Sequence, residues 1–148
     1  MPTLSPRLSL RDYRALAEVR YRIRAFLTFS EDAARDAGIE PQQHQLLLAV
    51  RGLPAGASAT IKTLAARLQI QHHSAVELAT RAEASALVRR HRSVDDRRVV
   101  TLGLTPHGAR VLERLSHEHR RELSAAAAHL ISALRTLTTA GRRRPRGR

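Results

Sequence analysis

Residues 87–104 have the sequence LVRRHRSVDDRRVVTLGL, and this stretch decides the fold. Its two flanks, 87–92 and 99–104, contain β-branched or apolar residues, while the middle, 93–98, is charged and typical of a turn. The pattern predicts a two-stranded β-hairpin. Side chains alternate between the two faces of a strand, so the five arginines of this stretch cannot all face one partner.

Two short helical patterns, at residues 60–68 and 72–85, come directly before the hairpin. The first has apolar residues on one side, namely Ile61, Leu64, Ala65 and Leu68. The second is expected to bury Ala75, Val76, Ala79 and Ala82. Two short helices joined by three residues predict a helix-turn-helix, although the turn contains no glycine. A hairpin that directly follows a helix-turn-helix is a wing.

Longer helical patterns flank this module. Residues 10–36 contain no helix breaker, and Pro41 opens a further helix that ends before Gly52. Thr105 and Pro106 begin a long helix that Gly141 ends, with a break expected near residues 125–128. The apolar stripes of the two long helices consist of Tyr13, Leu16, Val19, Ile23 and Phe26, and of Leu112, Leu115, His119, Leu123, Ala126, Leu130, Leu134 and Leu137.

These elements predict a mainly α chain with a small two-stranded β wing, in a single domain spanning residues 1–148. The winged helix-turn-helix DNA-binding lobe covers residues 41–104. Residues 8–37 and 106–140 are expected to be dimerisation helices, because a lobe this small does not need helices of this length. A monomer whose terminal helices both cover the lobe is the alternative. Residues 141–148 are expected to form a disordered basic tail, which either contacts DNA or only aids solubility.

The chain is strongly basic, with a formal net charge of +13 at pH 7. All but one of its 26 cationic side chains are arginines, and without the five in residues 142–148 the chain still carries +8. Such a body favours a polyanionic partner, because neutralising phosphates releases their counterions. A solvated, arginine-rich surface is the alternative.

Other features of the composition exclude whole classes of protein. The sequence contains no cysteine, which excludes a disulfide framework, a zinc ribbon and thiol chemistry. No apolar run approaches the length of a membrane span, about 18 residues, and no signal peptide is evident, which predicts a cytoplasmic, nucleoid-associated protein. Phosphate-binding loops, nucleophile elbows and activated carboxylate clusters are missing from the sequence, so no enzyme activity, cofactor or metal site is predicted.

The predicted recognition helix begins near residue 72, and its start and next turn are expected to face DNA. Glutamine, arginine and glutamate side chains match the edges of adenine, guanine and cytosine. The candidates on this helix are Gln71, His72, His73, Ser74, Glu77 and Arg81. Two alternatives stay open: Glu77 and Arg81 pair with each other on the helix surface, or the histidines only cap the helix or fill the turn.

The wing supplies a second group of candidates: Arg89, Arg90, Arg92, Asp96, Arg97 and Arg98. Arg97 and Arg98 lie near the tip, where they suit a narrow minor groove with its concentrated negative potential. A carboxylate beside DNA makes sense if it holds a neighbouring arginine in one pose. An ordinary Asp-rich turn is the alternative reading of Asp95 and Asp96.

Four segments resemble the MarR family of bacterial winged-helix transcription regulators: LAARL at 64–68, LVRR at 87–90, DRR at 96–98 and LTPHG at 104–108. The similarity extends over about residues 10–138 and implies a dimer that binds palindromic operator DNA, usually as a repressor. It also implies that Asp96 braces Arg98, the minor-groove arginine. The departures are Ala86, where the family usually has a glycine that eases a left-handed helix exit, Ala82 in place of a leucine, and Glu40 in place of a small capping residue.

The resemblance further implies release from DNA by a small aromatic or acidic effector. Its candidate contacts, which are otherwise ordinary core or surface residues, are Tyr13, Arg20, Tyr21, Arg24 and His44. The predicted function is a sequence-specific double-stranded DNA-binding transcription regulator, acting as a homodimeric repressor. A non-specific architectural DNA-binding protein and a winged-helix protein-interaction module are the alternatives.

Overall fold

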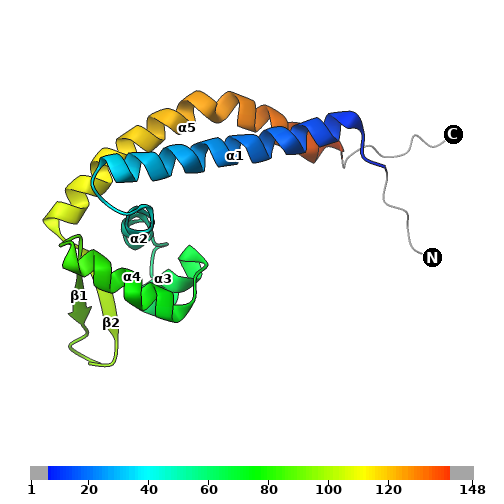
Figure 1. The fold of residues 1–148 in the computed structure, drawn as a ribbon. Helices are drawn as coiled ribbons and strands as arrows, with labels where there is room; N and C mark the ends of the chain where they lie inside the picture. The colour runs from blue at the N-terminus through cyan, green and yellow to red at the C-terminus, as the bar shows by residue number, and fades with distance from the viewer. Residues whose placement is uncertain (1–6, 141–148) are drawn as a thin grey trace, which may run out of the picture. The chain divides into compact units, whose positions relative to one another are not determined.

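The computed structural model describes residues 7–140, which contain five helices and one two-stranded sheet (Figure 1). In chain order the elements are α1 (Leu10–Asp36), α2 (Pro41–Arg51), α3 (Ile61–Leu68), α4 (His72–Ala84), β1 (Val88–Arg92), β2 (Val100–Leu104) and α5 (Pro106–Ala140). The predicted mainly α fold with a two-stranded wing is confirmed. The chain divides into a helical unit, with described residues 7–29 and 119–140, and a central unit of residues 30–118.

The central unit packs α2, α3, α4 and the sheet around one aliphatic core. The buried members of this core are Leu46, Leu47, Leu64, Leu78, Ala79, Ala82, Leu87, Val88, Leu102 and Leu112. Each fully buried leucine contributes about 1.5–3 kcal/mol, so the leucines of α2, α3, α4, the start of α5 and the sheet hold this unit together. Ala82, which replaces a larger residue of the family pattern, is fully buried in this core.

The predicted hairpin is present, with β1 antiparallel to β2 and Val88 opposite Leu104. The outer edge of β2 is covered by the segment before α3, where the Leu102 amide donates to the Ala59 carbonyl at 2.9 Å. This bond and the packing of both strands on the core attach the wing to the helix-turn-helix.

Two non-glycine residues in the described chain adopt the left-handed conformation, and each ends a helix: Gln69 and Ala86, both with φ of 55°. Gln69 makes the turn between α3 and α4 without a glycine. After Ala86, the Leu87 amide donates to the Ala82 carbonyl at 2.9 Å, the bond that closes a Schellman motif. The left-handed exit from α4 is therefore kept although the sequence has alanine at this position.

The start of α5 is tied to the end of α4 through Thr105. The Thr105 hydroxyl donates to the Ala86 carbonyl at 2.6 Å and accepts from the Gly108 amide at 2.9 Å. Gly108 lies so close to the α4–β1 turn that a Cβ there would collide with the Leu87 carbonyl oxygen. The threonine and glycine of the LTPHG segment are thus explained by the docking of α5 on this turn.

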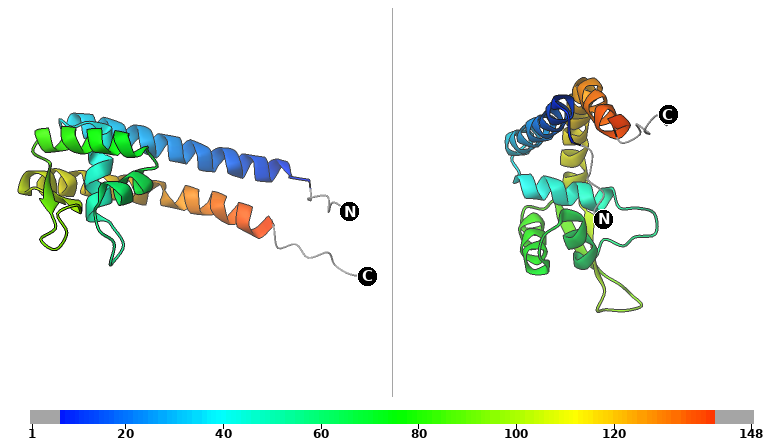
Figure 2. Two further views of the ribbon diagram at one scale, coloured as in Figure 1. Left: turned by 90° about the horizontal axis from the view of Figure 1, so that it is seen from below. Right: turned by 90° about the vertical axis from the view of Figure 1, so that its right-hand side faces the viewer.

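The helical unit pairs the first part of α1 with the last part of α5 (Figure 2). His119 is buried between the helices, where the rings of Phe26 and Phe29 meet it edge-on at centroid distances of 5.7 and 5.3 Å. Ala15 and Ala133 are also buried, so small residues bring the helices together elsewhere. The α5 helix is continuous, so the break expected near residues 125–128 does not occur. Alanine is the best helix former, which accounts for this continuity.

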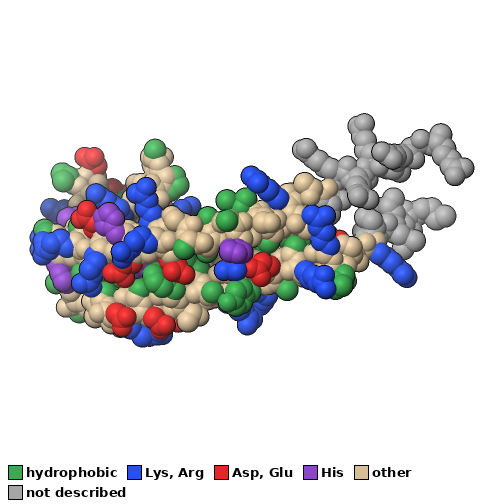
Figure 3. Space-filling model, turned by 90° about the horizontal axis from the view of Figure 1, so that it is seen from above, with side chains coloured by type: hydrophobic (Ala, Val, Ile, Leu, Met, Phe, Trp, Pro, Cys, Tyr) green, Lys and Arg blue, Asp and Glu red, His purple; other side chains and the backbone are tan. Residues whose placement is uncertain are grey.

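Much of the predicted apolar stripes is exposed in the single chain, where apolar side chains lie at the surface among charged ones (Figure 3). Tyr13, Leu16, Ile23 and Leu27 are between 47% and 60% exposed and share one face of α1; they are called the open stripe below. On α5, Leu123, Ile131 and Leu134 are also exposed. Scattered apolar residues are ordinary at a protein surface, but a series at helical spacing indicates a missing partner.

We predict that Ala86→Gly raises the free energy of unfolding by about 1 kcal/mol, because alanine is strained in the left-handed region and glycine is not. Urea unfolding followed by circular dichroism measures the change. Ala66→Gly, at an exposed position inside α3, is the matched control and should lower the free energy of unfolding instead. A destabilised Ala86→Gly protein would contradict the left-handed turn.

Candidate nucleic-acid interface

The α4 helix buries one face and exposes the other. Ala75, Leu78, Ala79 and Ala82 are buried, and the exposed residues at its start and along its outer face are Gln71, His72, His73, Val76, Glu77, Thr80 and Arg81. The prediction that Val76 belongs to the core is wrong, since its side chain is 37% exposed. At 100° per residue, Val76 points well away from the centre of the buried face, a position that Leu78 occupies more closely.

Arg81 is held by the N-terminal end of α2. Its Nε donates to Glu40 Oε2 at 3.1 Å, and its Nη2 donates to Gln42 Oε1 at 3.4 Å. It therefore does not pair with Glu77 one turn earlier, which was the alternative drawn from the sequence. Glu40, unusual as a capping residue, gains a role as the partner of Arg81.

Arg90 joins the wing to α4. Its backbone N–H donates to Glu83 Oε2 at 3.0 Å, and its guanidinium donates to Glu83 Oε1 at 2.7 Å and to Thr80 Oγ1 at 3.0 Å. The bond from the Arg90 amide, followed by the bond from its guanidinium, lowers the pKa of Glu83. This carboxylate is therefore charged at neutral pH, and we refer to the pair as the Glu83–Arg90 clamp.

The two faces of the hairpin differ in what they can contact. Arg90 stands opposite the buried Leu102 and is engaged by α4. Arg89 and His91 belong to the other face and are exposed, and the His91 ring lies against Gly103, where a Cβ would approach its Nε2 to 2.9 Å. The alternation predicted for the wing is present, and it leaves only part of the arginines facing outward.

The turn of the wing is held by hydrogen bonds around Asp96. Its carboxylate Oδ1 accepts from the backbone N–H of Arg98 at 2.9 Å, and its carbonyl accepts from the N–H of Val99 at 3.0 Å. Asp96 thus contacts the main chain of Arg98 and not its guanidinium. Arg97 and Arg98 are exposed, and the ion pairs found within residues 7–140 do not include either one. Arg92 makes only a long contact, 3.5 Å, with the Arg97 carbonyl.

The candidates predicted from the sequence therefore fall into two groups within the central unit, where the hairpin lies beside α4 (Figure 1). Those whose side chains make no hydrogen bond or ion pair with described residues are Gln71, His72, His73, Glu77, Arg89, Arg97 and Arg98. The others are engaged or covered: Arg81 and Arg90 are held by carboxylates, Arg92 and Asp96 contact the backbone of the wing turn, and Ser74 is partly buried. The sequence analysis did not include Val76, Thr80 or Glu83 among the site candidates. The pairing of Glu83 with Arg90 could not be predicted from their spacing, because a helix end and a turn lie between them.

The candidate effector residues are not gathered within either unit. Tyr13, Arg20, Tyr21 and Arg24 are exposed on the part of α1 in the helical unit, whereas His44 is buried in the central unit. Within residues 7–140 no group of three or more metal-ligating side chains occurs. The helices in this range are also too polar or too short to cross a membrane.

A helix-turn-helix followed at once by a β-hairpin defines a winged helix-turn-helix protein. Residues 37–99, which include α2, α3, α4, β1 and the turn of the wing but not β2, match the sequence model of the MarR family. This central part of the chain is therefore similar to the MarR family of winged helix-turn-helix proteins, as the motifs predicted.

Solved structures of MarR-family proteins share this fold. A MarR family protein from Bacillus stearothermophilus superposes with a TM-score of 0.69 at 19% identity, over 91% of this chain and 96% of that chain. AbsC, a MarR family transcriptional regulator from Streptomyces coelicolor, gives 0.65 at 20% identity, over 86% and 84%. A mutant of MepR from Staphylococcus aureus, bound to an oligodeoxyribonucleotide, gives 0.60 at 18% identity, over 78% and 94%. No match was found among curated protein sequences.

We predict that Glu83→Gln lowers the melting temperature at pH 7 by about 2 °C, because the neutral amide weakens both bonds to Arg90. Because the pKa of Glu83 is lowered in the folded protein, its stabilising effect is complete above the ordinary pKa of glutamate and is lost as the pH falls through the lowered value. Thermal unfolding at a series of pH values should show the two proteins converging in acid. Glu77→Gln, on the same helix but without a partner, is the control and should change neither property. A difference between wild type and Glu83→Gln that stays constant with pH would contradict the clamp.

Proposed function

We propose that this chain is a sequence-specific double-stranded DNA-binding transcription regulator that acts at the nucleoid, in the cytoplasm, as a homodimer on a palindromic operator. The observation that carries the proposal is the exposure of Arg97 and Arg98 on a turn that Asp96 holds in shape. Guanidinium groups that form no ion pair with residues 7–140 suit phosphates and a narrow minor groove. The likeness to MepR, a mutant of which was solved with an oligodeoxyribonucleotide, supports the same kind of partner.

The first two turns of α4 supply the direct readout of bases in this proposal. Gln71 and Glu77 carry side chains that pair with adenine and cytosine edges in the major groove, and His72 and His73 stand beside them at the helix start. Helix N-termini also offer free amides to phosphates. Arg81 and Arg90 act as positioning residues, because their guanidinium groups are bound to carboxylates of the protein.

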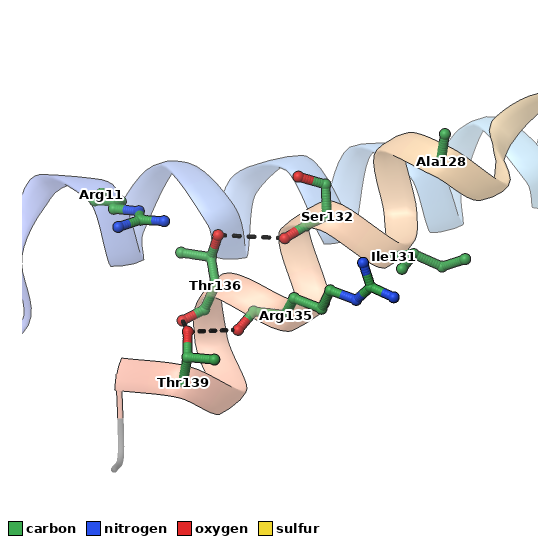
Figure 4. Close-up of a pocket in the computed structure, with 7 residues that line it drawn as sticks. All are labelled: Arg11, Ala128, Ile131, Ser132, Arg135, Thr136 and Thr139. Carbon is green, nitrogen blue, oxygen red and sulfur yellow. Dashed lines mark hydrogen bonds between the residues drawn. The ribbon is translucent and has the colours of Figure 1, made fainter. Parts of the chain in front are cut away.

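Dimerisation is supported by the open stripe of α1, which the single chain leaves uncovered. A groove of about 470 Å³ also lies on the helical unit, bordered by Arg11 of α1 and by apolar and polar residues of α5, among them Ile131 (Figure 4). The hydroxyls of Thr136 and Thr139 in this groove donate to carbonyls of their own helix. Because these hydroxyls already have acceptors, another helix could pack on this surface without leaving them unpaired. A two-fold dimer would place two recognition helices about one turn of duplex apart, which matches a palindromic site.

Repression, and release by a small aromatic or acidic effector, are proposed on the strength of the family alone. The effector candidates on α1, Tyr13, Arg20, Tyr21 and Arg24, are accessible, and Tyr21 stacks with the Arg22 guanidinium at 5.4 Å. His44 would require an opening of the central unit, since it is 3% exposed.

Selection of bound duplexes from a random pool, followed by salt titrations, tests the proposed function. The selected duplex should bind at least about 10³-fold more tightly than random DNA at the same salt concentration. A ratio near one would make the chain an architectural DNA-binding protein. No binding to any duplex at low salt would favour a protein-interaction module.

We predict that Arg98→Ala weakens binding to the selected duplex by more than about tenfold, because it removes the proposed minor-groove contact. Fluorescence anisotropy gives the affinity, and circular dichroism with size-exclusion chromatography shows that the folded dimer persists. Arg121→Ala, which removes the same charge from an exposed position in the helical unit, should leave the affinity nearly unchanged. An unchanged affinity for Arg98→Ala would remove the wing from the interface.

We predict that Ile23→Glu converts the dimer to monomer at micromolar concentration, because it places a charge in the middle of the open stripe. Analytical ultracentrifugation measures the mass. Thr28→Glu, at an exposed position of α1 outside the open stripe, is the control and should leave the dimer intact. If the Ile23→Glu protein stays dimeric, the open stripe is not the interface.

A further inference from the structure

Val76 is the one large hydrophobic side chain at the surface of α4, a helix that lies entirely within the described residues. It is not part of the core cluster of the central unit, which takes Leu78 and Ala79 from the same helix turn. Val76 keeps 37% of its surface exposed, so folding of the single chain leaves part of its apolar surface uncovered.

The surroundings of Val76 are the polar residues already proposed to face DNA. His72 and His73 precede it by four and three positions, Glu77 follows it, and all three are exposed on the same side of α4. One turn later this surface changes character. Thr80 accepts a hydrogen bond from Arg90, and Arg81 is bound to Glu40. The polar side chains of α4 that bind no other described side chain therefore lie on its first two turns, and Val76 lies among them.

In the major groove, the base edges offer donors and acceptors and one kind of apolar group, the C5-methyl of thymine. An apolar side chain on a recognition helix can therefore make a favourable apolar contact with thymine and not with the other three bases. We propose that Val76 is a specificity-determining residue that contacts the methyl group of a thymine in each half-site of the operator. The inference rests on the proposed function. It adds the recognition of thymine to the adenine and cytosine contacts proposed for Gln71 and Glu77.

Deoxyuridine tests this contact, since it differs from thymidine only by the missing methyl group. Each thymine of the selected duplex is replaced singly, in both half-sites, and affinities are measured by fluorescence anisotropy at one salt concentration. At one thymine position per half-site, the replacement should weaken wild-type binding by about fourfold per methyl, the effect of one buried carbon group. Val76→Ala should bind the thymine duplex more weakly and show no further loss with deoxyuridine at that position.

Two control variants separate this contact from general effects. Val94→Ala removes the same atoms from the turn of the wing, where Val94 is 98% exposed, and should keep the full penalty for deoxyuridine. Glu77→Gln changes the neighbouring side chain on α4 and should keep the penalty as well. Because Val76 is exposed and alanine favours helix, Val76→Ala should fold with an unchanged circular dichroism spectrum.

The proposal is overturned if deoxyuridine costs the wild type nothing at every position, if the selected half-sites contain no thymine, or if Val76→Ala retains the full penalty. These results leave the proposed function intact, because the selected duplex would still bind far more tightly than random DNA. If the selection yields no preferred duplex, both the proposed function and the inference about Val76 are overturned before any thymine is replaced.

Discussion

The packing of both strands on the core and one carboxylate together set the position of the wing relative to α4. Glu83 accepts from both the amide and the guanidinium of Arg90, so a single side chain of the helix fixes the backbone and the side chain of β1. At the base of the hairpin, Thr105 ties the exit of β2 to the turn that ends α4. With both strands anchored, the turn of the wing is carried at a set distance from the recognition helix. In the proposed function, this fixed distance is what would allow the exposed Arg98 to reach a groove of DNA.

The order and limits of the elements could be predicted from the sequence because local signals mark them. Thr105 and Pro106 begin α5, Pro41 begins α2, and a charged turn between two apolar flanks makes the hairpin. Tertiary contacts decided what local signals could not. Ala86 takes the left-handed conformation because the packing of α5 on the α4–β1 turn requires that exit, whatever the residue.

The sequence predicted which residues make up the candidate site, but not which of them are bound by other side chains. Composition and motif placed arginines on the wing and polar residues on α4, but they gave no means of telling bound arginines from free ones. Arg81 and Arg90 find their partners across long stretches of sequence or past a helix end, so only the folded structure shows them engaged. Val76 was predicted to be buried and is partly exposed. A helix rich in alanine has no sharply defined apolar face, so its sequence does not fix the direction in which a valine points.

Hydroxyl-radical footprinting on the selected duplex tests most directly the central claim, that two copies present α4 and the wing to one side of DNA. The account predicts two protected segments related by a two-fold axis, with centres about 10–10.5 base pairs or a multiple of this apart. It also predicts protection of the minor groove on the outer side of each segment, where the wings reach. One protected segment without symmetry, or even protection along the whole duplex, would contradict it.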